Sequence, residues 1–334
     1  MKAIGYKSPL PIEDAHSLVD IEIPVPEPKG RDLLVEVHAV SVNPVDVKIR
    51  ASARPEGTEY KILGWDASGI VKAAGSDTSL FKPGDEVYYA GSIARPGTNA
   101  EFHLVDERIV GRKPKSLSFT HAAAMPLTTI TAWELLFDRL EVKKDDAGTL
   151  LIVGGAGGVG SILIQLACKL TGLKIVATAS RPETKQWCLD LGAHYVIDHA
   201  KSLAEQLQDI DLPEVEYIGS LTATDTHYPG LVNVLAPQGK IGVIDDPSSL
   251  DAKPLKRKAA SLHWELMFTR SLFGTPDMIA QHQLLNEVAD HIDRGLICTT
   301  ATEIIGTINA ANLRKAHALI ESGHTRGKMV LEGF

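Results

Sequence analysis

Between residues 149 and 245, short apolar runs alternate with segments of helical pattern. Several of the runs are continuously apolar, as expected of strands that are buried on both faces of a parallel sheet. The runs are LLIVG (150–154), KIVATAS (174–180), HYVID (194–198), EYIGSL (216–221) and KIGVID (240–245). Helices are expected between them, at 161–172, 182–191, 200–208 and 227–236. The alternation predicts an α/β fold with a doubly wound parallel sheet.

The chain before residue 120 has a different pattern, in which short alternating runs are broken by Gly and Pro. These runs predict a β-rich region, and they are LLVEVHAVSV (33–42), SGIVKAAG (68–75), DEVYYAG (85–91) and AEFHLV (100–105). A helical pattern follows over 119–145, where Pro126 is expected to break or kink the helix. The last part of the chain mixes predicted helices, at 276–294 and 309–322, with short strands and ends in the strand-like KMVLEG.

A glycine motif stands where the first strand of the parallel sheet meets its helix, in the sequence TLLIVGGAGGVG. We expect Gly155 to permit the tight turn, Gly157 to let backbone N–H groups approach phosphates, and Gly160 to let the helix pack closely on the strand. The start of the helix would then offer unpaired N–H groups to a pyrophosphate. The same predicted site includes the backbone of Ala156, Gly158 and Val159. Between a strand and a helix, the motif predicts a dinucleotide site rather than a structural glycine turn.

The end of the second parallel strand indicates which dinucleotide is bound. In NAD-binding proteins an acidic residue about 20 positions after the glycine motif holds the ribose 2′-hydroxyl. Here Ser180 and Arg181 occupy that place, and Lys185 follows one helical turn later. A hydroxyl and a guanidinium suit a 2′-phosphate, so the sequence favours NADP(H). Ser180 is alternatively, or in addition, the cap of a helix that opens at Pro182.

Charge and composition exclude several classes of partner. The formal net charge is −8 without a basic stripe, which argues against nucleic acid as the main partner. No apolar run approaches the ~18 residues that span a bilayer, so no membrane partner is expected. The first residues lack the apolar core of an export signal, and the three cysteines are far apart. We therefore expect a cytoplasmic location.

The chain resembles the medium-chain dehydrogenase/reductase superfamily, and within it the zinc-lacking quinone oxidoreductase branch. The resemblance covers nearly the whole sequence and depends on motifs that occur in the family's order. They are VSVNPVDVKIR (40–50), ILGWDASGIVKAAG (62–75), FKPGDEVY (81–88), AAAMPLTTITAWE (122–134), VGGAGGVGS (153–161), ELMFTRSLF (265–273) and GHTRGKMVLEG (323–333). The resemblance implies a GroES-like catalytic domain at 1–124, completed by 277–334, and a Rossmann NADP-binding domain at 125–276.

The zinc ligands of the superfamily's alcohol dehydrogenases are missing at the matching positions. The first cysteine is replaced by Asn43, the Gly-His-Glu triplet reads Gly64-Trp65-Asp66, and the third ligand falls near Leu127. Residues 85–110, where a structural zinc lobe is expected, contain no cysteine. An indole and an amide do not replace imidazole and thiolate as zinc ligands. No metal is therefore expected.

The resemblance also implies roles for side chains near the nicotinamide. Asn43 and Asp46 would position the cofactor and the substrate carbonyl, although Asn43 could belong to a simple turn and Asp46 could be a helix N-cap or a structural hydrogen-bond partner. Thr129 would meet the nicotinamide, unless it only packs its helix. The segment that lies near the nicotinamide in relatives contains Phe268, Thr269 and Arg270.

Three further residues have two interpretations each. Tyr60 is either a proton or hydrogen-bond donor to a carbonyl or a packing residue. Trp65 either shapes the substrate pocket or belongs to the core. Lys328 either reaches the cofactor or is a surface lysine.

The resemblance and the missing ligands together predict an NADPH-dependent, zinc-independent oxidoreductase. Its acceptor would be a small electrophile, either a quinone or an α,β-unsaturated carbonyl, because hydride donation to such compounds needs no Lewis acid. One alternative is a zinc-dependent alcohol dehydrogenase with atypical ligands. Another is a non-catalytic protein that binds NADPH as a stabilising ligand or as a sensor. Relatives often pair edge strands, so a homodimer or homotetramer is expected.

Overall fold

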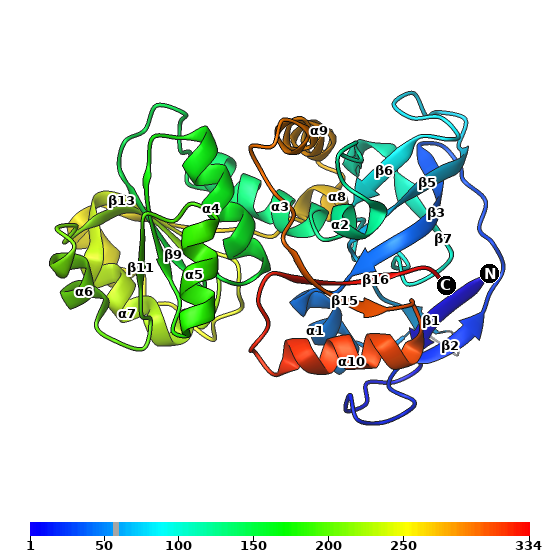
Figure 1. The fold of residues 1–334 in the computed structure, drawn as a ribbon, viewed down its shortest axis with the longest axis horizontal. Coiled ribbons are helices and arrows are strands. Elements are labelled where there is room, and N and C mark those ends of the chain that lie inside the picture. The colour runs from blue at the N-terminus through cyan, green and yellow to red at the C-terminus, as the bar shows by residue number, and fades with distance from the viewer. Residues whose placement is uncertain (56–59) are drawn as a thin grey trace. The chain divides into compact units, whose positions relative to one another are not determined.

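The computed structural model describes residues 1–55 and 60–334. The described chain divides into two compact units, one formed by Met1–Ile130 with Phe268–Phe334 and the other by Thr131–Met267. The second unit contains a parallel sheet with helices between its strands, and the first is rich in antiparallel strands (Figure 1). This arrangement confirms the predicted fold class.

The sheet of the second unit has the strand order β11-β10-β9-β12-β13-β14, and every neighbouring pair is parallel. Its strands are β9 (Thr149–Val153), β10 (Lys174–Thr178), β11 (Tyr195–Ile197), β12 (Val215–Ser220), β13 (Leu235–Val243) and β14 (Ser261–Trp264). The helices of this unit are α4 (Gly158–Leu170), α5 (Pro182–Asp190), α6 (Leu203–Asp209) and α7 (Thr224–Val234), with the short η3 (Lys253–Lys258). The predicted alternation is therefore correct, but the edge strand β14 was not predicted.

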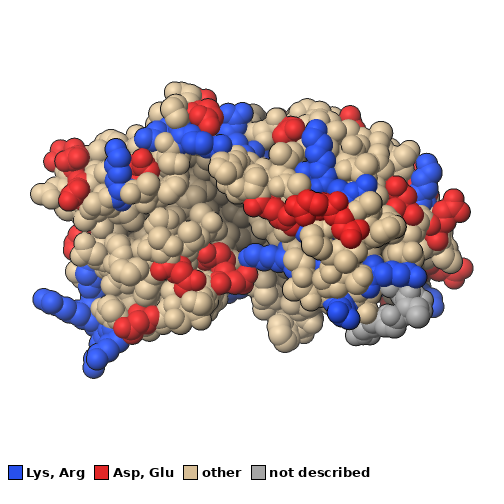
Figure 2. Space-filling view, turned by 90° about the horizontal axis from the view of Figure 1, so that it is seen from below, with Lys and Arg blue, Asp and Glu red and all other residues tan. Residues whose placement is uncertain are grey.

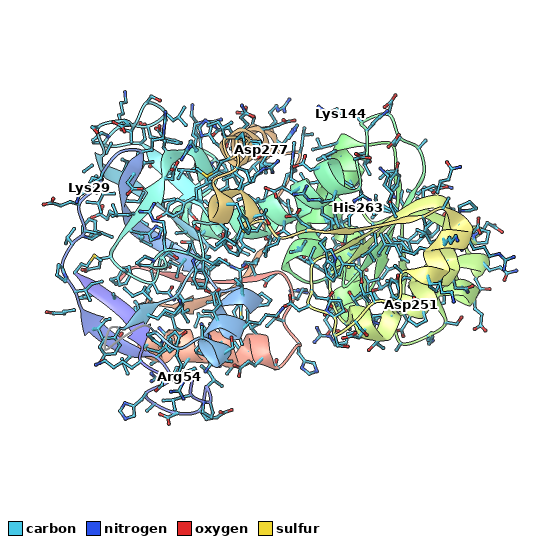
Figure 3. The ribbon with its side chains drawn as sticks, turned by 180° about the vertical axis from the view of Figure 1, so that it is seen from behind. Lys29, Arg54, Lys144, Asp251, His263 and Asp277 are labelled. Atoms are coloured by element: carbon cyan, nitrogen blue, oxygen red, sulfur yellow. The ribbon has the colours of Figure 1, made fainter. Side chains whose placement is uncertain are left out.

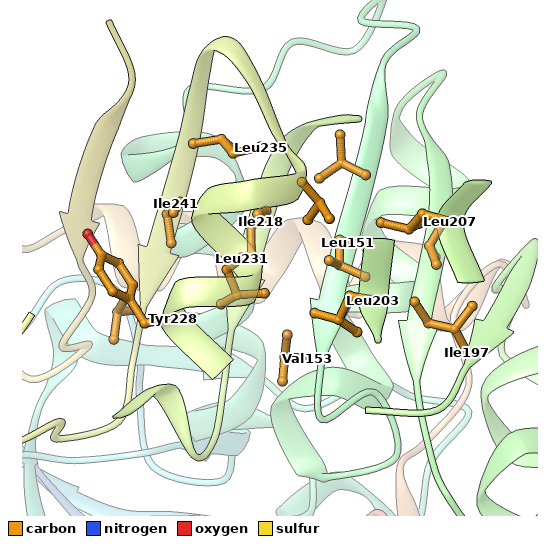
Figure 4. Close-up of a cluster of buried hydrophobic side chains, with 14 of the residues drawn as sticks. Leu151, Val153, Ile197, Leu203, Leu207, Ile218, Tyr228, Leu231, Leu235 and Ile241 are labelled. Atoms are coloured by element: carbon orange, nitrogen blue, oxygen red, sulfur yellow. The ribbon is translucent and has the colours of Figure 1, made fainter. Parts of the chain in front are cut away.

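Apolar side chains from the strands and from α6 and α7 form a core on one face of this sheet (Figure 4). Leu151 and Val153 of β9 contribute from the centre of the sheet, and Leu207 and Leu231 contribute from the helices. All four are buried, and burying such a side chain stabilises the fold by about 1.5–3 kcal/mol. This packing holds the carboxyl ends of the strands in one row, which is where α/β proteins bind their ligands.

In the first unit, the larger sheet has the order β15-β16-β3-β5-β6-β8, with β7 also paired to β3, and a smaller sheet has the order β2-β1-β4. The strands are β1 (Lys2–Tyr6), β2 (Val19–Glu22), β3 (Asp32–Ser41), β4 (Lys61–Ile62), β5 (Ala67–Ala74), β6 (Glu86–Tyr89), β7 (Phe102–Asp106), β8 (Val110–Arg112), β15 (Ala301–Gly306) and β16 (Lys328–Glu332). The helices are α1 (Pro44–Ser52), α2 (Phe119–Ala123), α8 (Thr269–Phe273), α9 (Ala280–Asp293) and α10 (Ala310–Glu321), with the turn η1 (Glu107–Ile109). The closing strand β16 pairs with β3, which brings residue 328 next to the end of β3.

The helical stretch after α2 is divided as its proline predicts. Pro126 is the first residue of α3 (Pro126–Trp133), because a proline lacks the N–H that a helix interior needs. The helix then widens into a π-helical turn, η2 (Glu134–Arg139). π-helical turns are rare in proteins overall, and those that occur are often found at functional sites.

Charged residues of both signs are scattered over the face drawn in Figure 2. Within the described residues, no helix has the length and apolar character needed to cross a membrane. The cytoplasmic location stays a prediction.

Candidate functional site

The turn after β9 has its positive φ at Gly154 (+85°). The turn role predicted for Gly155 is therefore wrong by one position. A Cβ on Gly155 would lie 2.8 Å from the Cβ of Ala177 and 3.1 Å from the Sγ of Cys188. Gly155 is needed because β10 and α5 pack directly against this turn.

The helix that follows begins without a side-chain cap, because its N-cap is Gly157. A Cβ on Gly157 would have only the Gly154 carbonyl oxygen near it, at 3.5 Å, so this side of the turn is open. A Cβ on Gly160 would lie 2.4 Å from the same oxygen, which confirms that Gly160 permits close packing. The first N–H groups of α4, including those of Gly158 and Val159, have no helical partner and can receive an anion.

The next strand end carries the residues predicted to choose the dinucleotide. Ser180 is exposed, and Arg181 is the N-cap of α5, so the alternative in which Ser180 caps the helix is wrong. The Nε of Arg181 lies 3.3 Å from Oε1 of Glu183. The backbone N–H of Lys185 donates to the carbonyl of Arg181, which places Lys185 one turn further along. A 2′-phosphate would compete with Glu183 for the guanidinium.

His199 is a candidate that the sequence reasoning missed. β10 and β11 are parallel and pair Thr178 with Ile197, so His199 follows its strand by two residues, as Ser180 follows Thr178. His199 and His227 have ring centroids 5.8 Å apart and line a pocket of about 420 Å³. Burial lowers the pKa of His227. In the sequence, the signal for His199 was a polar residue directly after the third predicted parallel strand (194–198 in the prediction, β11 in the structure).

In the first unit, a buried polar cluster joins Asn43, Asp66 and Lys328. The ammonium of Lys328 lies 3.1 Å from Oδ2 of Asp66 and donates to Oδ1 of Asn43. The amide Nδ2 of Asn43 donates to the same Asp66 oxygen at 3.2 Å. Lys328 is only 4% exposed, so the interpretation of Lys328 as a surface lysine is wrong. Asn43 is likewise part of a cluster and not of a simple turn.

Asp46 supports this cluster from the first turn of α1. One of its carboxylate oxygens accepts from the N–H of Asn43 at 2.7 Å and the other from the N–H of Gly64 at 3.0 Å. The N-cap of the helix is Asn43, so the N-cap alternative for Asp46 is wrong and the structural hydrogen-bond role is observed. Burial is the main reason that the pKa of Asp46 is raised to about 7; the nearby Asp66 charge acts in the same direction, while the Asn43 N–H and Lys328 oppose the shift.

Burial also raises the pKa of Asp66 and lowers that of Lys328. Their neighbours nevertheless suit the ion pair. Asp66 accepts from the hydroxyl of Ser41 at 2.8 Å and from the N–H of Leu127 at 3.1 Å, which stabilises a carboxylate. The ammonium also donates to the carbonyl of Val42 at 3.1 Å, so it has three acceptors.

The positions that carry zinc ligands in the family's alcohol dehydrogenases do not offer a zinc site here. Asn43 and Asp66 are bound to Lys328, Leu127 has an apolar side chain, and the indole N–H of Trp65 donates to the carbonyl of Ser92 at 3.1 Å. Within the described residues, no three His, Cys, Asp or Glu side chains group as ligands of one ion. The donor set does not fit zinc.

The two aromatic candidates, Trp65 and Tyr60, make contacts of other kinds. Trp65 is 0% exposed and meets the ring of Phe268 edge to face, which is the packing of a core residue, and a part in shaping the substrate pocket stays a prediction. Tyr60 is 39% exposed, and the ammonium of Lys7 lies 4.5 Å from the centre of its ring. In the part of the chain that the structure describes, no hydrogen bond joins Tyr60 to Asn43 or Asp46.

Three other predicted contacts have clear local environments. The hydroxyl of Thr129 is buried and, among the described residues, has no hydrogen-bond partner. Thr269 begins α8, directly after the buried Phe268. The guanidinium of Arg270 binds Oδ2 of Asp277 through Nε at 3.0 Å, and Asp277 lies between α8 and α9 (Figure 3). Cofactor contact by these residues stays a prediction.

Two family models match the chain. Residues 29–115 match the alcohol dehydrogenase GroES-like domain, and residues 191–331 match a zinc-binding dehydrogenase domain. A zinc-type alcohol dehydrogenase-like protein of Staphylococcus epidermidis (strain ATCC 12228 / FDA PCI 1200) is 38% identical over 336 residues, which cover 99% of each chain. The chain belongs to the medium-chain dehydrogenase/reductase superfamily. It is therefore an oxidoreductase with an NAD(P)-binding fold.

Two solved structures and one further relative are similar to this chain over most of its length. The crystal structure of a candidate zinc-dependent alcohol dehydrogenase from Rhizobium etli CFN 42 is 58% identical, covers 100% of this chain and 98% of its own, and has a TM-score of 0.97. The mitochondrial NAD(P)H oxidoreductase RTN4IP1 of Mus musculus is 30% identical over 90% of this chain and 81% of its own. The Escherichia coli quinone oxidoreductase complexed with NADPH is 24% identical, covers 99% of this chain and 100% of its own, and shares the fold with a TM-score of 0.84.

Proposed function

We propose that the protein is an NADPH-dependent oxidoreductase that reduces quinones or α,β-unsaturated carbonyl compounds without zinc. The observation that carries the proposal is the ion pair between Lys328 and Asp66. Asp66 and Asn43 stand in two of the segments that match the zinc ligands of the family's alcohol dehydrogenases, and Lys328 of β16 binds both of them. A protein that has an amide at the first ligand position, and a lysine bonded to that amide and to Asp66, needs an acceptor that reacts without a Lewis acid.

Bound NADPH would supply the hydride. The open glycine turn and the uncapped start of α4 fit its pyrophosphate. Ser180, Arg181 and Lys185 stand where the 2′-phosphate of the adenosine is expected, and we add His199 because it lies at the neighbouring strand end. Arginine presents paired donors to phosphate oxygens, which supports NADP(H) over NAD(H).

The acceptor class follows from the chemistry of the first unit. Reduction of a quinone or an enone generates an enolate-like oxygen, which needs hydrogen-bond donors and then a proton. Asn43 has two amide hydrogens, and Asp66 accepts one of them. The second hydrogen is the donor that we assign to the developing oxygen.

Turnover tests this proposal directly. Purified protein is mixed with NADPH and a panel of quinones and enones, with and without a zinc chelator, while the loss of nicotinamide absorbance is followed. We expect turnover that the chelator leaves unchanged. A protein that binds NADPH tightly but reduces no acceptor would instead be a sensor or a structural binder. Stoichiometric zinc, with alcohol oxidation that the chelator abolishes, would support the alcohol dehydrogenase alternative.

We also propose that the protein is a homodimer or homotetramer. β14 is an outer strand of its sheet, so one of its backbone edges has no strand beside it among the described residues. Trp264, the last residue of that strand, is 54% exposed. Sedimentation equilibrium gives the mass in solution, and a monomer at all concentrations would exclude the proposal.

A further inference from the structure

Lys328 uses its whole hydrogen-bonding capacity inside the protein. Its three ammonium hydrogens have three acceptors, the Val42 carbonyl, the Asn43 amide oxygen and Oδ2 of Asp66. An ammonium that is only 4% exposed and fully bonded is held in one place. It is therefore a fixed charge of the site and not a mobile surface group.

The ion pair determines which way the Asn43 amide faces. The amide oxygen accepts from the ammonium, and the amide nitrogen donates to the Asp66 carboxylate. If the amide were flipped, its N–H groups would face the ammonium and its oxygen would face the carboxylate. Both contacts would then be repulsive, so only one orientation is stable.

We propose that Lys328 is a positioning residue, which fixes the orientation of the Asn43 amide through its buried bonds to Asn43 and Asp66. This inference rests on the proposed metal-free reaction, because the oriented amide is the donor assigned there to the developing oxygen.

A contribution to stability does not by itself explain why the protein has a buried ion pair between Lys328 and Asp66. Replacing a buried ion pair by apolar residues of similar volume is often neutral or stabilising, whereas removing one partner strands a charge. A neutral pair at 66 and 328 should therefore leave the fold intact while releasing the amide. Comparing the single and double substitutions therefore separates a role of the ion pair in stability from its role in positioning the Asn43 amide.

The experiment uses Lys328→Met, Asp66→Asn and the double variant, in the full-length protein. Thermal unfolding, NADPH affinity by fluorescence, and kcat and KM with the fastest quinone acceptor are measured for each. We expect Lys328→Met to lower the unfolding midpoint by about 10 °C, because Asp66 is left charged without its counter-ion. The double variant should regain most of this loss, yet keep a kcat at least about 10-fold below wild type, with NADPH affinity within about threefold. If Lys328→Met does not fold, the kcat and NADPH affinity of the double variant are compared directly with those of the wild type.

Lys315→Met is the matched control, since Lys315 is exposed on α10 in the same unit, and it should change none of these quantities. A double variant with wild-type kcat would overturn the proposal, as would a kcat that follows the unfolding midpoint through the series. If the wild type reduces no acceptor, the proposed function fails separately. The energetic coupling between Lys328 and the Asn43 amide, which the proposal requires, is then measured by a double-mutant cycle between Lys328→Met and Asn43→Ala in unfolding. Coupled effects support the proposal, and additive effects overturn it.

Discussion

Gly160 packs so closely on Gly154 that a Cβ on Gly160 would come within 2.4 Å of the Gly154 carbonyl oxygen. We predict that Gly160→Ala separates α4 from the turn and lowers the free energy of unfolding by about 1–3 kcal/mol. Urea unfolding measures this change. Gly157→Ala is the matched comparison, because its methyl group would have only an ordinary contact at 3.5 Å. It should fold normally and lose NADPH affinity by at least about 10-fold, since the methyl would stand where the phosphates approach.

Arg181 should set the preference for NADPH over NADH. We predict that Arg181→Ala weakens NADPH binding by at least about 10-fold and leaves NADH binding nearly unchanged, because only the 2′-phosphate loses a partner. Calorimetric titration with both nucleotides measures the difference. Glu183→Gln is the control, since it removes the side-chain charge that lies 3.3 Å from Arg181 and should strengthen NADPH binding. Equal losses for the two nucleotides in Arg181→Ala would contradict the assignment.

His199 should act on cofactor binding and not on chemistry. We predict that His199→Ala raises KM for NADPH about 3- to 10-fold with kcat unchanged, because the contact lies at the adenosine end and is the same in the ground and transition states. Steady-state kinetics at saturating acceptor measures both constants. His16→Ala, in an exposed loop of the other unit, is the control. A fall in kcat with no change in KM would remove His199 from the cofactor site.

Glu265 should make stability depend on pH. Its carboxyl is buried beside Glu134, and burial followed by the Glu134 charge raises the pKa of Glu265 to about 8 from an ordinary 4.5. The folded protein thus holds a proton that the unfolded chain releases, so stability is highest at low pH and falls as pH rises from about 4.5 to about 8. The slope approaches about 1.4 kcal/mol per pH unit for one proton. Urea unfolding of Glu265→Gln between pH 5 and pH 9 should show a flatter profile than wild type; parallel profiles would refute the shift.

The sequence predicts the parallel sheet well because its strands are continuous apolar runs with helices between them, and 149–153 and 174–178 are found as expected. β14 was missed because Ser261–Trp264 is only four residues long and mixes polar with apolar side chains, and it becomes a strand through pairing with β13. The turn residue was placed one position too late, since adjacent glycines at 154 and 155 leave the positive φ undetermined until the packing is known.

The buried cluster was only partly predictable. The resemblance pointed to Asn43 and Asp46, but no local pattern shows that Lys328 is buried, because a lysine that opens the final strand looks like a surface residue. Its environment comes from the pairing of β16 with β3, which brings distant parts of the chain together. Trp65 illustrates the reverse case, where an aromatic residue in a functional motif belongs to the core.

The outer position of β14 has a practical consequence for every measurement above. An open strand edge that carries a large exposed aromatic residue favours contact between copies of the chain, and such contact weakens on dilution. His263 and Trp264 on this strand would then report assembly through their solvent exposure (Figure 3 labels His263). Affinities and unfolding midpoints should accordingly be compared at one protein concentration, and a shift of the midpoint with concentration would itself measure the strength of self-association.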